Sequence, residues 1–258
     1  MIKKDLKFIE EFKGELLKIN PDKILGPKEH EDIGSFFIAL GMIYNDLKCL
    51  LWMSSVLENK YRKPIAGEIS PHAGNYNGTK VYLHKILVST LDEFFSFLIS
   101  RKKIFKNDKF LQILKRLPQS DQKIWKDLEL YLDGKDENLK TFISSLAVVR
   151  SNVAFHYDQS DNFLKKGFIK FFSNSPKNKF NQEAYYSVSD SMELTRYYFA
   201  DAAVEASIPI MLENKLGKNL SRYVADFKYN IAKMTISISS ILSCYLKFAR
   251  NEPGWRSK

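Results

Sequence analysis

Residues 220–248, LSRYVADFKYNIAKMTISISSILSCYLKF, give the clearest indication of the fold. Apolar side chains recur along it at alternating spacings of four and three residues, at Leu220, Val224, Phe227, Ile231, Met234, Ile238, Ile241, Tyr245 and Phe248. This repeat places one continuous apolar stripe along a helix, as in an antiparallel bundle or a coiled coil. Regular charges beside the stripe, typical of a coiled coil, are absent. We therefore expect a core helix of a bundle.

Working outward, similar periodicity predicts helices over residues 2–19, 36–59, 81–98, 108–116, 120–132, 137–155 and 190–216, with a capping box at Asp190 and Glu193. Segments 22–32 and 63–78 are rich in Pro, Gly or Asn and read as loops. Two short β-prone runs, 167–172 and 184–189, flank a turn-rich segment. The expected fold is one all-α domain over residues 1–258, an antiparallel helical bundle with a small β-hairpin or ordered loop inserted at about 163–189.

The composition is that of a globular protein, with 45% hydrophobic residues, 27% charged residues, 11 glycines and 8 prolines in 258 residues. Two widely spaced cysteines, Cys49 and Cys244, form no disulfide framework, which favours the reducing cytoplasm. No signal peptide is recognisable, and the most apolar window, Thr235 to Phe248, is short and rich in serine. We therefore expect a cytoplasmic protein without a membrane span.

The chain carries a net charge of +10, which points to an anionic partner. Basic residues gather in two runs, at Arg101, Lys102, Lys103, Lys106 and Lys109 and at Lys165, Lys166, Lys170, Lys177 and Lys179. Aromatic residues are interleaved with both runs, for example Phe105 and Phe168. Lysines neutralise phosphates and aromatic rings stack on unpaired bases, so the runs fit an RNA-binding surface. A general bias of the composition toward lysine and phenylalanine is the alternative.

The strongest chemical signal is LAVVRSNVAFHYD, residues 146–158. Arg150 falls at the centre of an apolar helix side, where a guanidinium needs an anion or a polar interface as partner. His156, six residues later, is the side chain best suited to proton transfer near neutral pH. Asn152 lies one turn before His156 and can orient the imidazole or donate to a phosphate, and Tyr157 returns beneath Arg150.

An arginine followed by histidine at the end of a bundle helix resembles the R-x(4–6)-H motif of the HEPN superfamily, and VRSNVAFHYD is similar to the "AFHYD" form of bacterial members. The resemblance covers about residues 139–158. It implies a metal-independent RNA endonuclease without cofactor, in which the 2′-OH attacks the adjacent phosphorus and leaves a 2′,3′-cyclic phosphate. Arg150, His156 and Asn152 would be catalytic, and Lys165, Lys166, Lys170 and Tyr157 would bind RNA.

The resemblance also implies a homodimer that joins two motif helices at one composite site. A role as a toxin or phage-defence effector, with an antitoxin-like protein partner, follows from the same resemblance. The absence of metal-ligand spacing among His30, His72, His84 and His156 agrees with metal-independent chemistry.

Two other functions stay open. One is a catalytically silent HEPN-like module that binds RNA or protein, which Ser151 favours because the family usually has Asn, Asp or His directly after the arginine. The other is a structural bundle in which Arg150 pairs with Asp46, Asp92 or Glu93.

Overall fold

The computed structural model describes residues 17–151, 161–173, 183–188, 190, 195–217, 219–251 and 255, with only the backbone at 161 and 162. The helices, in chain order, are α2 (Pro21–Leu25), η1 (Lys28–His30), α3 (Glu31–Lys60), α4 (Pro71–Ser100), η2 (Lys102–Lys106), α5 (Asp108–Leu114), α6 (Gln119–Leu132), α7 (Glu137–Val149), α8 (Asp161–Phe172), α9 (Tyr198–Leu216) and α10 (Leu220–Asn251). The predicted all-α class is confirmed over these ranges, which contain no strand.

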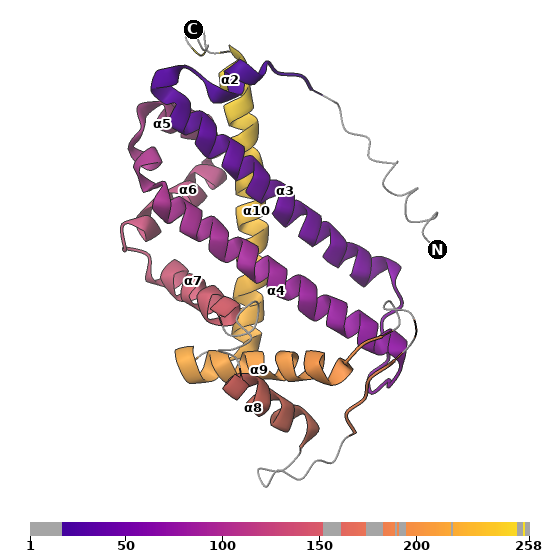
Figure 1. The fold of residues 1–258 in the computed structure, drawn as a ribbon. Coiled ribbons are helices and arrows are strands. Elements are labelled where there is room, and N and C mark those ends of the chain that lie inside the picture. Colours follow the sequence, from indigo (N-terminus) through magenta and orange to yellow (C-terminus); the bar gives the residue numbers. More distant parts are fainter. Residues whose placement is uncertain are drawn as a thin grey trace.

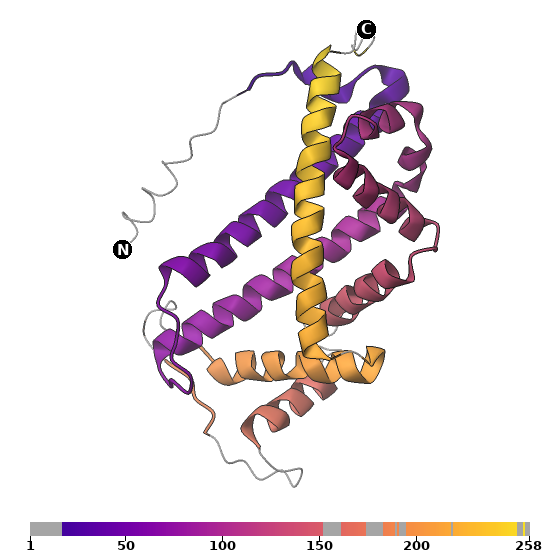
Figure 2. The same ribbon diagram turned by 180° about the vertical axis from the view of Figure 1, so that it is seen from behind.

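Three long helices form the centre of the fold. α3 and α4 lie side by side and run in opposite directions, and α10 crosses both obliquely (Figures 1 and 2). α5, α6 and α7 follow one another along one side of this group (Figure 1). α9 lies across the lower end of the group, with α8 packed against it (Figure 1).

α10 confirms the helix expected from the opening stretch, and it contacts α2, α3, α5, α6, α7 and α9. Most of the predicted stripe is buried, namely Phe227, Ile231, Met234, Ile238, Ile241, Tyr245 and Phe248. The first turns differ from the prediction, because Leu220 and Val224 are exposed while Tyr223 is buried. A helix of 3.6 residues per turn drifts relative to a 3.5-residue repeat, so its buried side shifts toward one end.

α4 begins ten residues earlier than the sequence suggests, inside the predicted 63–78 loop. Ser70 caps its first turn by accepting a hydrogen bond from the Ala73 N–H at 3.1 Å, and Pro71 suits the first helical position. Gly74 packs so closely on α9 that a Cβ there would lie 2.1 Å from the Tyr198 ring. This glycine therefore serves close helix packing rather than a turn.

The 22–32 loop is also partly helical in the structure, since α2 and η1 occupy most of it. Asn20 caps α2 by accepting the Asp22 N–H at 2.9 Å. The predicted helix over residues 2–19 lies mostly outside the described residues, and 17–20 are not helical.

The inserted β-hairpin is not supported. Residues 167–172, expected as a strand, belong to α8. Phe168 and Phe172 share one helix side at a spacing of four, with ring centroids 4.7 Å apart. Gly167 is buried against α9, where a Cβ would lie 2.3 Å from the Ala203 carbonyl oxygen. The aromatic run thus has helical as well as β character, and packing against α9 favours the helix.

The helix expected from Asp190 begins later, at Tyr198. Ser187 and Arg196 form an isolated antiparallel bridge, with N–H to O distances of 2.8 and 2.9 Å. Arg196 is thus paired with Ser187, and its Nε donates to Asp201 in the first turn of α9 at 2.9 Å. Residues 195–197 are not helical, and residues 191–194, which include Glu193 of the predicted capping box, lie outside the described residues.

Two stretches, Lys28–Lys60 and Leu220–Asn251, are long and apolar enough to cross a membrane by length and composition alone. They contain α3 and α10, which supply much of the core, and core helices of soluble proteins pass the same test. The expected absence of a membrane span therefore stays a prediction.

Candidate functional site

Arg150 closes the last turn of α7 and reaches across to the middle of α4. Its Nη1 donates to Asp92 Oδ2 at 2.6 Å, and its Nη2 donates to Glu93 Oε1. These bonds, led by the one to Asp92, raise the pKa of Arg150 above its usual value. Of the three carboxylates expected as partners, the structure selects Asp92 and Glu93.

The two carboxylates differ in their environment. The Asp92 side chain is 11% exposed, whereas that of Glu93 is 60% exposed and that of Arg150 33%. The charge of Asp92 also contributes, after burial, to raising the pKa of the neighbouring Tyr131. Asp92 is therefore a partly buried anchor for the guanidinium, and Glu93 is a solvent-exposed second partner.

His156, Asn152 and Tyr157 lie outside the described residues, so their positions relative to Arg150 stay predictions. Ser151, the departure from the family pattern, is described. Its hydroxyl donates to the Val148 carbonyl at 3.3 Å and so bonds within its own helix turn. The α-helical part of α7 ends at Val149, and Arg150 and Ser151 continue it as a π-helical turn. The predicted helix end at residue 155 lies outside the described residues.

The lysines proposed to bind RNA lie on α8, where Lys165, Lys166 and Lys170 are all exposed. Lys166 Nζ lies 5.7 Å from the centroid of the Phe163 ring, and Lys215 Nζ from α9 lies 5.3 Å from it. The packing of α8 on α9 thus adds Lys215 to this basic surface. Sequence spacing gives no signal for Lys215, because only tertiary packing brings it to α8.

The basic run at 101–109 has a different character. Arg101, Lys102, Lys103 and Lys106 are exposed around η2, but the interleaved Phe105 is buried. Its ring centroid lies 6.0 Å from that of Trp125, within the core. The aromatic residues predicted to stack on bases beside these lysines, Phe105 and Phe110, are both buried and pack in the core instead.

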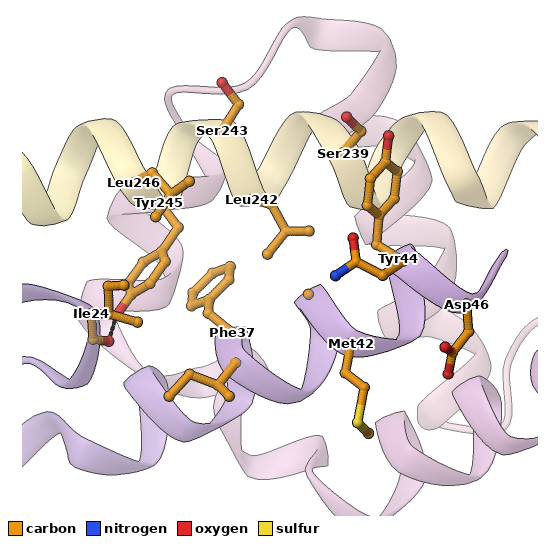
Figure 3. A pocket seen from close by; sticks show the side chains of 13 residues that line it. Ile24, Phe37, Met42, Tyr44, Asp46, Ser239, Leu242, Ser243, Tyr245 and Leu246 are labelled. Carbon is orange, nitrogen blue, oxygen red and sulfur yellow. Dashed lines mark hydrogen bonds between the residues drawn. The ribbon is translucent and has the colours of Figure 1, made fainter. Parts of the chain in front are cut away.

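Asp46, the third carboxylate considered as a partner of Arg150, faces another part of the molecule. It lines a groove of about 800 Å³ between α3 and α10 (Figure 3). Leu242 and Phe37 lie along its floor, and Met42 extends from α3 (Figure 3). This groove is separate from the α4–α7 contact that holds Arg150.

Within the described ranges, no group of three or more His, Cys, Asp or Glu side chains is placed to hold a metal ion. His72 Nε2 lies 2.8 Å from the Arg62 carbonyl oxygen, and His30 stacks on Trp255. His84, expected at the surface, is instead half-buried and hydrogen-bonded to Tyr223.

Comparison of the chain with protein-family models, curated proteins and solved structures gives no match.

Proposed function

We propose that this protein is a metal-independent RNA endonuclease of the HEPN type that acts in the cytoplasm. The observation that carries the proposal is the position of Arg150 at the C-terminal end of α7. Asp92 anchors its guanidinium, and one third of the Arg150 side chain is exposed to solvent. An arginine held in this way presents a fixed guanidinium to an incoming phosphate. The histidine six residues later and the exposed lysines of α8 supply the remaining chemistry.

In the proposed reaction, the ribose 2′-OH attacks the adjacent phosphorus. The new bond joins the 2′ oxygen to phosphorus, the bond from phosphorus to the 5′ oxygen breaks, and the products are a 2′,3′-cyclic phosphate and a 5′-OH. His156 accepts the proton from the 2′-OH or donates one to the leaving 5′ oxygen. Arg150 binds the scissile phosphate and stabilises the charge that develops on its oxygens, with Asn152 as a further donor.

RNA reaches Arg150 in this proposal by replacing Glu93. Because the Glu93 side chain is 60% exposed, its pair with Arg150 is weakened by water and salt, and a phosphate can take its place. Asp92 stays bound and keeps the guanidinium oriented. Lys165, Lys166 and Lys170, with Tyr157, hold the neighbouring phosphates and bases of the strand.

We propose further that the active form is a homodimer that pairs two motif helices, so that one cleft contains two copies of Arg150 and His156. Such a nuclease would serve as a toxin or phage-defence effector, with an antitoxin-like protein as its natural inhibitor. Sedimentation of the purified protein tests the dimer.

The direct experiment is incubation of the wild-type protein with a fluorescent single-stranded RNA in excess EDTA. The proposal expects cleavage, with 2′,3′-cyclic phosphate ends, at the same rate as without EDTA. Cleavage that disappears on chelation and returns with Mg²⁺ contradicts it, because that behaviour requires a metal-bound nucleophile or leaving group.

A second candidate is a catalytically silent module that binds RNA or a protein. The observation that favours it is that both terminal nitrogens of Arg150 already donate to carboxylates. Two assays together separate the candidates: a gel shift with 2′-O-methyl RNA, which this chemistry cannot cleave, measures binding, and incubation with unmodified RNA measures cleavage. Binding of RNA without cleavage of unmodified RNA supports the silent module. If the protein neither binds nor cleaves RNA, Arg150 is a structural residue.

A further inference from the structure

A second, independent feature lies between α3, α4, α9 and α10, away from Arg150. It is a cavity of about 430 Å³, within the range of small-molecule sites in proteins. Buried apolar side chains from all four helices form its walls, among them Leu57, Leu83, Leu87, Ile208, Phe227 and Ile231. Most of the lining is therefore apolar, and much of it belongs to the buried core.

One polar pair lies among these walls. The Tyr223 hydroxyl and His84 Nε2 are 3.2 Å apart, and the His84 ring meets the Phe227 ring edge-on at 4.9 Å. Tyr223 is almost wholly buried, whereas His84 is half-buried and lines the cavity. A histidine and a tyrosine placed in an apolar wall give a ligand a place to exchange a hydrogen bond, and Ser54 and Asn77 also line the cavity.

The interior carries no formal charge at neutral pH. Burial, with a smaller contribution from the charge of Lys80, lowers the pKa of His84 to about 4. Burial also raises the pKa of Tyr223 well above its usual range, so both groups stay neutral. The charged residues of the lining are exposed and balance in sign, with Lys80 and Lys228 against Glu58 and Glu205. A charged ligand would lose its hydration without gaining a partner inside.

We propose that this cavity binds an uncharged, mainly apolar small molecule that lies against the His84–Tyr223 pair. Its neutral interior selects against anionic and cationic ligands of the same shape. The site is distinct from the RNA site proposed above, and its occupation does not depend on RNA cleavage.

The experiment uses the full chain and two related probes, N-phenyl-1-naphthylamine and its anionic sulfonated analogue 1-anilino-8-naphthalenesulfonate. Equilibrium dialysis should give one saturable site per chain for the neutral probe, with affinity at least about tenfold higher than for the anionic probe. No saturable site for the neutral probe, or equal affinity for both probes, overturns the proposal.

Two matched variants on α10 locate the site. Val224 lines the cavity and is 37% exposed, and Leu246 lines the α3–α10 groove and is 40% exposed. Val224→Trp fills the cavity and should weaken binding of the neutral probe at least about tenfold, whereas Leu246→Trp should leave it unchanged. An unchanged affinity in Val224→Trp, or an equal loss in Leu246→Trp, contradicts the assignment.

A local spectroscopic readout guards against an indirect effect of the new tryptophan on the fold. The chain has four histidines, so the His84 ring resonance can be assigned by its loss in His84→Phe. A concentration of the neutral probe that just saturates the wild type should shift that resonance in the wild type and in Leu246→Trp but much less in Val224→Trp. A probe that binds without moving the His84 resonance lies elsewhere and overturns the proposal.

Discussion

The Arg150 guanidinium donates to the Asp92 carboxylate over 2.6 Å and so ties the last turn of α7 to the middle of α4. The partner of the arginine is thus a side chain of the same domain, 58 residues earlier in the sequence. Glu93, the next residue on α4, accepts a hydrogen bond from the second terminal nitrogen of Arg150, and its side chain is exposed to solvent. One arginine therefore makes a nearly buried contact and a solvent-exposed contact at once.

The first prediction concerns the stability that each contact contributes. Asp92→Asn removes a nearly buried charge partner and should lower the free energy of unfolding by about 1.5–3 kcal/mol. Glu93→Gln, the matched neutralisation one residue later, should cost less than about 1 kcal/mol because that pair is open to water. Urea denaturation of both variants measures the difference. Equal losses would contradict the assignment of Asp92 as the anchor.

The second prediction concerns competition between Glu93 and RNA. Glu93→Gln should tighten binding of 2′-O-methyl RNA about twofold to fivefold, the gain expected when a surface pair of about 0.4–1 kcal/mol no longer has to break. Glu137→Gln is the control, because it makes the same charge change on the exposed first turn of α7, roughly 20 Å along the helix from Arg150. A gel-shift titration compares them, and equal tightening in both would indicate only a general charge effect.

The third prediction uses salt dependence to locate the RNA surface. The wild-type affinity for single-stranded RNA should fall with salt with a log–log slope of magnitude about 3 or more. Replacing Lys165, Lys166 and Lys170 by Gln should reduce that magnitude by about 2, because each lysine that contacts a phosphate contributes about 0.7. The same replacement at Lys102, Lys103 and Lys106, which lie on η2 between α4 and α5 rather than on α8, should leave the slope unchanged. If instead the η2 replacements reduce the slope and the α8 replacements do not, the RNA-binding surface lies at η2.

The sequence predicts the long helices well where the apolar period is unbroken, as in α10 and in the body of α3 and α4. It fails where tertiary contacts give a residue another role. Gly74 reads as a turn residue but lets α9 approach α4, and Gly167 does the same between α8 and α9. The run at 167–172 has both helical and β character, and only its packing partner decides between them.

For the candidate site, the sequence shows that Arg150 needs an anionic partner but cannot choose among Asp46, Asp92 and Glu93. The choice depends on which helices are neighbours. α7 packs against α4, which brings Asp92 and Glu93 within reach, whereas Asp46 lines the α3–α10 groove (Figure 3). The cavity around His84 gives no sequence signal, because a lone histidine near a lysine is typical of a helix surface.

The fourth prediction concerns pH. The pKa of His84 is lowered to about 4 in the folded protein, below about 6.5 in an unfolded chain, so the unfolded state binds a proton first as pH falls. The contribution of neutral, buried His84 to the free energy of unfolding is fully present above about pH 6.5 and is lost between about pH 6.5 and 4. His84→Phe should therefore lose less stability than the wild type between pH 7 and 4.5, by on the order of 2 kcal/mol. Urea denaturation at both pH values checks it, and parallel losses would contradict it.

In the proposed reaction, Arg150 and His156 cleave RNA without a metal ion. The most direct test is the single-turnover cleavage rate of a 5′-labelled RNA in excess EDTA, with identification of the product ends and with melting temperatures recorded for every variant. We expect cyclic phosphate ends from the wild type and unchanged activity in the control His72→Ala. The rates should be at least about 100-fold lower in His156→Ala and Arg150→Ala, and His156→Ala should keep the wild-type melting temperature. A wild type that does not cleave, or His156→Ala that cleaves at the wild-type rate, would contradict it.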